Sequence, residues 1–318
     1  MTRTDDPGHI GPIGVGEAWA VVTALSYGAT NLLLRAAAVH IDPWLGSMLR
    51  QVPVAILAWA VIGLARNDEL RPRSPRFLGW PFLLALVASG LVSYVIGNLL
   101  FFDALATGSL GVAASGAQAG VVLVSVLLGP VALRERPILL GYLGAGTIVV
   151  GLAFVALAGG GASTPDWLAG LFLSLGAGAS YAIANVLTRL VQRTRPTTFV
   201  ALGMASLGGL GPLLAIEAVR GGGNPLAGAD PGQVWVVLAA GCFNALALIG
   251  IVQSLRTANV AVASSIQSGA VVFSFIGAVL LFGEAAPPLM IAGVTLVTAG
   301  IVLAQLRRPT RPPLPRAS

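Results

Sequence analysis

The chain has 318 residues, of which 56% are hydrophobic and 9% are charged, and its mean hydropathy is +0.88. Soluble domains usually carry about 25% charged residues, so this composition excludes a soluble globular protein and indicates a membrane protein. The net charge of +6 comes from arginine alone, because the chain contains no lysine. The single cysteine, Cys242, excludes an internal disulfide.

Apolar runs of about 20 residues, the length that a membrane helix requires, recur along the chain. In chain order they form two sets of five, which are 17–37, 44–65, 78–102, 109–132 and 138–158, then 167–190, 197–219, 233–255, 259–282 and 288–306. A glycine-rich linker separates the two sets. We therefore expect an N-terminal arm, a first repeat, the linker, a second repeat and a tail, at residues 1–16, 17–158, 159–166, 167–306 and 307–318.

The first span of each set carries the same polar pattern. Residues 25–36 read LSYGATNLLLRA and residues 179–190 read ASYAIANVLTRL, so serine, tyrosine, asparagine and arginine recur in register. The last three are four residues apart and therefore follow one face of a helix. Because the number of spans in each set is odd, the second set enters the membrane from the opposite side. The sequence predicts an all-α membrane protein with ten transmembrane helices in two inverted five-helix repeats.

The arginines indicate the orientation of the chain in the membrane. If the N-terminus lies in the cytoplasm, most of the arginines fall in cytoplasmic loops and only Arg220 lies outside. Cytoplasmic loops of multi-pass proteins carry this excess of positive charge. We expect a multi-pass protein of a bacterial plasma membrane, with both termini in the cytoplasm. The tail is rich in arginine and proline, and we expect it to be disordered and close to anionic lipid.

Arg50 is the costliest residue for a membrane helix to bury, because an arginine near the bilayer centre costs about 2.5–3.5 kcal/mol on insertion scales. It lies well inside the predicted span 44–65. Two interpretations stay open. Arg50 is either a structural residue that reaches the outer interface or pairs with Asp103, or it anchors an anionic group in a central cavity.

Other polar residues recur one helical turn apart or at equivalent places in the two halves. Such residues either form hydrogen bonds that hold the helices together or line a cavity at the interface of the repeats. We favour the cavity. Together with Arg50, its candidate lining residues are Tyr27, Asn31, Tyr94, Asn98, Gln118, Tyr181, Asn185 and Gln267.

Small residues one helical turn apart are predicted to allow close packing of the spans 109–132 and 259–282. They are Gly116 and Gly120 in the first half, and Ser265 and Gly269 in the second. Glu17, near the inner end of the first span, is a candidate proton-coupling residue. Glu135 and Glu284 lie at the ends of spans, where we expect them to cap helices or pair with loops rather than carry protons.

The ordered set of motifs resembles the EamA-type transporters of the drug/metabolite transporter superfamily, over nearly the whole chain. Their first span usually carries an aromatic residue and a basic residue eight positions later, as Tyr27 and Arg35 do here. Their ninth span usually ends in Gly-Glu, present as Gly283-Glu284. The chain departs from the family at Gln51, where an aromatic residue usually follows the arginine, and the proline common in the middle of the fourth and ninth spans is absent.

The resemblance implies a secondary transporter that works by alternating access at a central cavity between the repeats. We expect an exporter of small metabolites such as amino acids or related compounds. No Walker-type phosphate loop occurs and lysine is absent, so ATP is not the direct energy source. The expected partners are a small-molecule substrate and the lipid bilayer. Facilitated diffusion and antiport with protons both stay open, so protons are a partner only in the second case. No cofactor, metal or nucleic acid is expected.

Two other classes of function stay open. A membrane scaffold that transports nothing would show the same composition and the same spans. An intramembrane enzyme would need a nucleophile and a base, or metal ligands, at membrane depth. Acidic residues in the spans are few and scattered, and His9 and His40 are the only histidines, so the enzyme is the weaker alternative.

Overall fold

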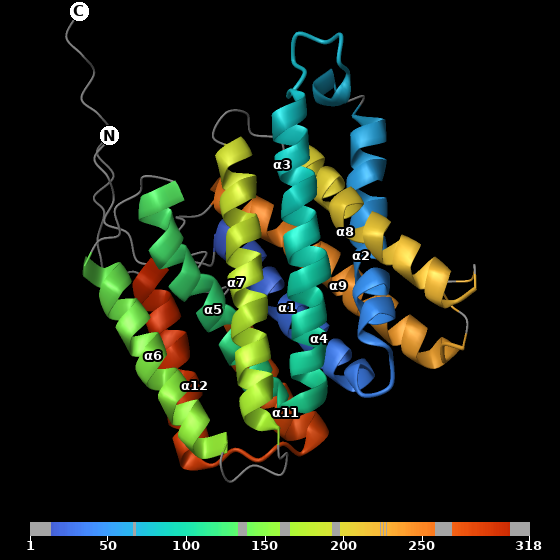
Figure 1. The fold of residues 1–318 in the computed structure, drawn as a ribbon. Helices are drawn as coiled ribbons and strands as arrows, with labels where there is room; N and C mark the ends of the chain where they lie inside the picture. Colours follow the sequence, from blue (N-terminus) through green and yellow to red (C-terminus); the bar gives the residue numbers. More distant parts are fainter. Residues whose placement is uncertain are drawn as a thin grey trace, which may run out of the picture.

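A computed structural model of the chain describes residues 14–65, 68–132, 139–159, 166–192, 198–222, 224, 226, 228–257 and 269–305. Within these ranges the regular secondary structure is helical, without a strand (Figure 1). The α-helices are α1 (Val15–Ala38), α2 (Pro43–Leu64), α3 (Trp80–Gly90), α4 (Asn98–Thr107), α5 (Leu110–Ala132), α6 (Leu139–Gly159), α7 (Trp167–Gln192), α8 (Thr198–Arg220), α9 (Pro231–Thr257), α11 (Gly269–Phe282) and α12 (Pro288–Gln305). A 3₁₀ turn, η1 (Asp68–Leu70), follows α2, and a π-helix, η2 (Leu91–Gly97), joins α3 to α4.

Seven helical segments of the described chain are long and apolar enough to cross a membrane. They are Pro43–Leu64, Trp80–Thr107, Leu110–Gly129, Leu139–Ala158, Trp167–Val191, Thr198–Arg220 and Pro231–Ile251. The apolar helices Gly269–Phe282 and Pro288–Ala304 are shorter. The expectation of an all-helical, multi-pass membrane protein is confirmed at this level. The complete set of ten spans is not part of this finding, because residues 259–268 of the predicted span 259–282 lie outside the described residues.

The first predicted span corresponds to α1, which does not belong to the seven. Its polar face explains this result, because Tyr27, Thr30 and Asn31 lower the hydropathy of the helix. Those residues face other helices rather than lipid. Thr30 is fully buried, and its hydroxyl donates to the carbonyl oxygen of Ala240 on α9 at 3.2 Å.

Helices from the two halves of the chain interleave. α1 packs against α9 and α11 of the second half, and α7 packs against α3, η2, α4 and α5 of the first half. α2 packs against both α8 and α9. In each half the first helix is therefore surrounded by helices of the other half, which brings polar residues from distant parts of the sequence together.

α6 and α12 lie side by side at one edge of the bundle (Figure 1). A Cβ atom added to Gly144 would lie 2.6 Å from the carbonyl oxygen of Gly300, and one added to Gly151 would lie 2.8 Å from that of Gly293. The reverse contacts are equally short, at 2.7 and 2.8 Å. The pairing is antiparallel, and the two glycines of each helix are seven residues apart. Such a contact is self-complementary, as an interface on a two-fold axis must be.

In the described part of the chain, buried apolar side chains form three clusters. The largest surrounds Phe102 and Leu34, near the end of the bundle where α1 leads into α2. A second cluster around Ile148 and Val297 fills the space between α5, α6 and α12. A third, around Leu86, lies between α2, α3 and α8. Arg50, Asn98 and Tyr181, discussed below, lie on helices α2, α4 and α7, which the largest cluster packs together.

Candidate functional site

Arg50 lies on α2 and is only 8% exposed, so it does not reach the surface of the bundle. Its Nη1 donates to Oδ1 of Asn98 on α4, and its Nη2 donates to Oδ1 of Asn244 on α9, both at 3.3 Å. Within the described residues it forms no ion pair, with Asp103 or any other acid. The predicted pairing of Arg50 with Asp103 is therefore absent, and amides of both halves take its place.

Three of the four tyrosines of the chain, Tyr27, Tyr94 and Tyr181, interact electrostatically with the Arg50 guanidinium. They come from α1, η2 and α7. The hydroxyl of Tyr181 donates at 2.9 Å to the same oxygen of Asn98 that accepts from Arg50. The sequence-predicted residues Arg50, Tyr27, Tyr94, Asn98 and Tyr181 thus come together. With Asn244 they form what we call the Arg50 cluster.

Backbone geometry positions two of these rings. Tyr94 lies in the π-helical stretch η2, and Asn98 directly follows it. π-Helical turns widen the backbone and are frequent at functional sites. A Cβ added at Gly209 on α8 would lie 2.4 Å from Cβ of Tyr94, and one at Gly97 would lie 2.7 Å from Cε1 of Tyr181. These two glycines leave the room that the tyrosine rings occupy.

Several polar atoms in and beside the Arg50 cluster have no hydrogen-bond partner among the described residues. They are Nε of Arg50 and Nδ2 of Asn98 in the cluster, and Oγ of Ser47 and Oε1 of Gln51 beside it on α2. Asn98 and Gln51 are each 1% exposed. Buried polar groups are nearly always hydrogen-bonded, so each orphaned atom calls for an explanation. The two atoms that belong to the cluster itself are N–H donors.

The two asparagines of the repeated stretch have different surroundings. Asn31 on α1 is half-buried, and its Nδ2 donates to Oγ of Ser274 on α11 at 3.1 Å. Asn185 on α7 is exposed. Gln118 is half-buried on α5, outside the hydrogen bonds of the cluster, and Gln267 lies outside the described residues. The structure therefore brings together some of the predicted lining residues and not the others.

The predicted packing glycines of the first half contact α7. A Cβ at Gly116 would lie 2.0 Å from Oγ of Ser174, and one at Gly120 would lie 2.5 Å from the carbonyl oxygen of Leu175. They allow α5 to approach α7 rather than α11. No described atom lies within 4 Å of a Cβ built on Gly269, and Ser265 lies outside the described residues.

Glu17 lies in the first turn of α1, where its carboxylate approaches Gly14. A carboxylate at this position is favoured by the helix dipole. Ten residues separate Glu17 from Tyr27, which is about 15 Å along a helix. The structure does not bring this candidate proton-coupling residue to the Arg50 cluster.

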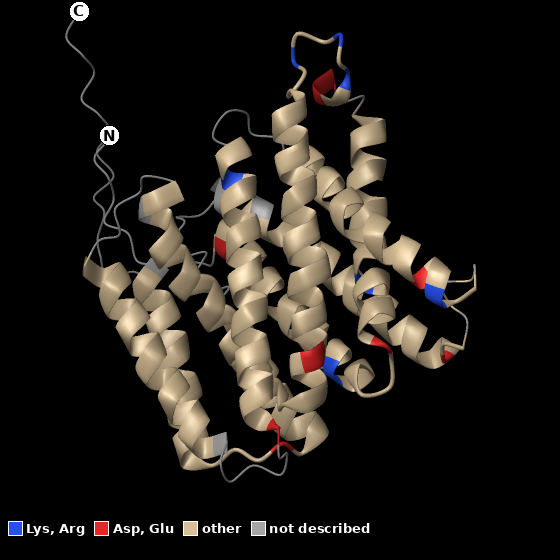
Figure 2. Ribbon diagram, in the orientation of Figure 1, with Lys and Arg blue, Asp and Glu red and all other residues tan. Residues whose placement is uncertain are grey.

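Among the described residues, two ionic contacts lie at the end of the bundle where α1 leads into α2. Figure 2 marks the positions of the charged residues along the ribbon. Nε of Arg35 lies 3.1 Å from Oε1 of Glu284, and its Nη1 donates to the carbonyl oxygen of Leu105. Glu284 also accepts from the backbone N–H groups of Leu110 and Gly111, at 2.9 and 3.4 Å. The expected capping role of Glu284 is confirmed for the first turn of α5.

The second ionic contact joins Arg220, at the end of α8, to Asp42 and Glu217. Nη1 and Nη2 of Arg220 each lie 2.9 Å from an oxygen of Asp42, and Nη1 lies 2.7 Å from Oε1 of Glu217. Asp42 also accepts from the backbone of Trp44, which caps α2. The hydrogen bonds from Arg220 hold the pKa of the Asp42 carboxyl below its usual range.

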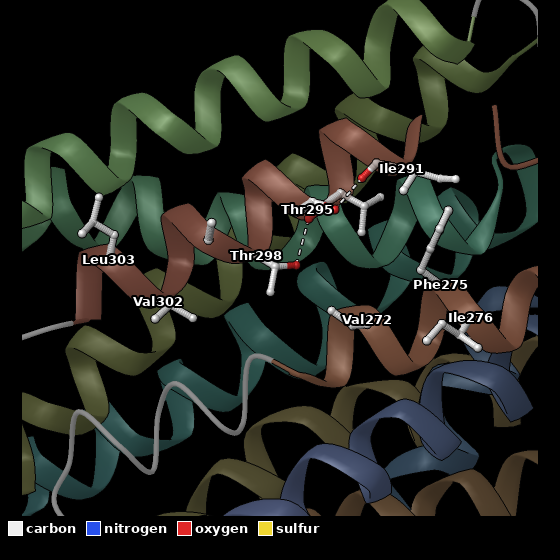
Figure 3. A pocket seen from close by; sticks show the side chains of 10 residues that line it. Val272, Phe275, Ile276, Ile291, Thr295, Thr298, Val302 and Leu303 are labelled. Carbon is white, nitrogen blue, oxygen red and sulfur yellow. Dashed lines mark hydrogen bonds between the residues drawn. The ribbon is translucent and has the colours of Figure 1, made fainter. Parts of the chain in front are cut away.

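A cavity of about 690 Å³ lies between α11 and α12 (Figure 3). Its lining is apolar except for Thr295 and Thr298, whose hydroxyls donate to carbonyl oxygens of their own helix. α12 packs mainly against α6 and more lightly against α5 and α11. The described residues give this cavity no charged or unpartnered polar group, and it belongs to a different part of the bundle from the Arg50 cluster.

Asn244 is the cluster residue that sequence reasoning missed. It is 4% exposed on α9, and it accepts a hydrogen bond from Arg50. The sequence feature that could have identified Asn244 is a single amide within an apolar run, because an amide in lipid is costly without a hydrogen-bond partner. No second amide lies one turn away, and the residue at the equivalent place in the first half is Tyr94 rather than an amide, so the pattern of pairs did not include it.

The comparisons with known proteins agree with this architecture. The EamA-like transporter family matches the chain twice, over residues 14–157 and 168–306. A solved structure described as "Crystal structure of protein" has a similar fold, with a TM-score of 0.59 and 18% identity, covering 92% of this chain and 98% of that chain. No curated protein matches the chain. The two family matches span most of the sequence, and the chain belongs to the EamA-like transporter family.

Proposed function

We propose that this protein is a secondary transporter that moves a small metabolite by alternating access, with the Arg50 cluster as its substrate site. One observation carries the proposal. A nearly buried arginine bridges an amide of the first half, Asn98, and an amide of the second half, Asn244. Transporters built from inverted repeats bind substrate near the bilayer midplane, at the interface of the two repeats. A buried charge at such an interface is a functional site by default.

The proposal includes ten transmembrane helices in two inverted five-helix repeats, at 17–158 and 167–306. The antiparallel contact between α6 and α12 supports this arrangement, because its paired glycines exchange places under a two-fold rotation. The interleaving of α1 and α7 with the opposite halves supports it as well. The arginine distribution supports cytoplasmic termini, an N-terminal arm at 1–16 and a tail at 307–318.

The two ionic contacts suggest which end of the pathway is closed. Arg35 with Glu284, and Arg220 with Asp42, join the ends of helices from both halves at the end that the arginines assign to the outside. Asn185 and Arg189, nearer the other end of α7, are exposed. We propose that the chain is closed outside in this conformation, and that opening to the outside separates Arg35 from Glu284.

We propose export as the direction and amino acids or related compounds as the substrates. The test uses vesicles with purified protein, loaded with a mixture of small metabolites whose loss is followed by mass spectrometry. We expect protein-dependent loss of at least one compound. Arg50→Gln should abolish this loss, because the substrate site then lacks its charge. Arg71→Gln, which changes an exposed arginine in a loop, is the matched control. Vesicles that release nothing would support the scaffold alternative.

A further inference from the structure

Resting on the proposed function, we infer that the Arg50 cluster binds an organic anion with a single carboxylate and no ammonium group. Among the amino acids or related compounds proposed above, the inference selects the related compounds that keep the carboxylate and lack the ammonium group, and it excludes the amino acids themselves. It follows from the charge balance of the cluster, from its unpartnered hydrogen-bond donors and from the tyrosines that belong to it.

The charge balance favours a ligand with one negative charge. Arg50 brings one positive charge into a buried position, and its contacts are uncharged. The ion pairs of the described residues use Arg35, Arg71 and Arg220 instead. A buried charge without a counter-charge is costly. A monoanion cancels it, a dianion leaves a negative excess, and a zwitterion leaves the positive charge in place.

The hydrogen-bond balance favours a ligand that only accepts. Nε of Arg50 and Nδ2 of Asn98 are the fully buried side-chain atoms of the cluster that lack a partner among the described residues, and both donate. The amide oxygens of Asn98 and Asn244 already accept from Arg50. A carboxylate only accepts, and it matches the planar guanidinium with two oxygens. An ammonium only donates. The unpartnered Oε1 of Gln51 could accept from it, but that uncharged atom does not change the charge balance.

The hydrogen bonds of Arg50 to Asn98 and Asn244 are long, so a ligand carboxylate can replace them. Both bonds measure 3.3 Å, whereas N–H···O bonds in proteins are usually about 2.9–3.0 Å. A carboxylate therefore competes with weak neutral bonds rather than with a strong ion pair. Tyr27, Tyr94 and Tyr181 interact electrostatically with the guanidinium, and the hydroxyl of Tyr181 bonds to Asn98. Tyrosine rings have apolar faces, which suit the hydrocarbon part of an organic acid.

The test compares compounds that share one skeleton and differ in charge. Full-length protein in detergent at pH 7.4 is titrated calorimetrically with 3-phenylpropanoate, 3-phenylpropanamide, phenylalanine, 2-phenylethylamine and 2-phenylethyl phosphate. A second series compares 4-methylpentanoate with leucine. We expect each monocarboxylate to bind about tenfold or more tightly than every other member of its series. Equal or tighter binding of the amino acids overturns the inference, as does the absence of binding by both monocarboxylates.

Asn244→Asp tests the charge argument without removing the arginine. The substitution conserves shape and places a carboxylate beside Arg50. We expect the variant to lose about tenfold or more in monocarboxylate affinity, and its thermal midpoint without ligand to rise, because the buried charge is then paired. Asn224→Asp makes the same chemical change in an exposed loop and should leave both quantities unchanged. Unchanged monocarboxylate affinity in Asn244→Asp overturns the inference.

Binding and transport separate this inference from the proposed function. Binding of a monocarboxylate that the protein does not carry across vesicles supports the site and contradicts the transporter. Transport of a compound without a carboxylate, with no monocarboxylate binding, supports the transporter and contradicts the site.

Discussion

Asp42 has two neighbours that favour its charged form. Its carboxylate accepts a hydrogen bond from the backbone of Trp44 in the first turn of α2, and two more from Arg220 at the end of α8. The bonds from Arg220 are the main reason that the pKa of Asp42 lies below its usual range. A carboxyl whose pKa is lower in the folded state stabilises the fold above its unfolded pKa of about 3.9. That stabilisation is lost as the pH falls through the lower, folded pKa.

We expect Asp42→Asn to lower the thermal midpoint of the detergent-solubilised protein at pH 7, because asparagine can still cap α2 but carries no charge for Arg220. The effect should be small, since the pair is partly exposed to solvent. The difference between variant and parent should shrink as the pH falls below about 4. Melting curves from pH 7 to pH 3.5 measure it, and a constant difference over that range would contradict the ionic origin.

Single residues of the site differ in how well the sequence predicts them. Arg50, Tyr94 and Asn98 could be identified because polar groups within an apolar span require a partner or a cavity. Asn244 obeys the same physics but lacked a repeated partner. The different surroundings of Asn31 and Asn185 could not be predicted. A sequence repeat predicts the same environment in both halves, whereas in one conformation of a transporter the two halves have different environments.

At the scale of helices, the contact between α6 and α12 depends on glycine. In Gly151→Ala, the new Cβ would lie 2.7 Å from the backbone nitrogen of Val297, so the helices must separate. We expect a loss of about 1–3 kcal/mol in stability, the usual range for overpacking. Gly146→Ala on the same helix meets no atom within 4 Å, and it should stabilise the helix by about 0.5–1 kcal/mol. Thermal unfolding of both variants in detergent measures the two changes in stability. Equal changes would contradict close helix packing as the reason that glycine is needed at position 151.

Helix boundaries show what hydropathy can and cannot predict. The span expected at 44–65 matches α2 closely, because an apolar run with an aspartate and a proline at its start defines a helix well. The span expected at 78–102 continues to Thr107 and contains η2, since apolar composition does not reveal the widened hydrogen bonding of a π-helix. Gly116 and Gly120 were correctly chosen as small, but composition alone could not say that they face α7.

At the scale of the whole molecule, orientation is the open prediction. In a Cys242→Ser background, a cysteine at Ser74 should react with a membrane-impermeant thiol reagent only in opened cells. A cysteine at Asn224 should react in intact cells. The excess of arginine in the predicted cytoplasmic loops is the reason. Reaction of both positions from the same side would contradict the inverted arrangement of the halves.

The glycine contact between α6 and α12 has a consequence for the ancestry of the fold. A contact that is its own complement needs only one sequence, so two separate copies of a five-helix chain, inserted in opposite directions, could meet through their last helices. Joined in one polypeptide, the partners meet at an effective concentration in the millimolar range rather than by chance encounter in the bilayer. After such a fusion, a substitution in one half no longer changes the other half. Asn244, which bonds to Arg50 and has no amide at the equivalent place in the first half, is a difference of this kind, because two copies of one sequence must carry the same residue at each position.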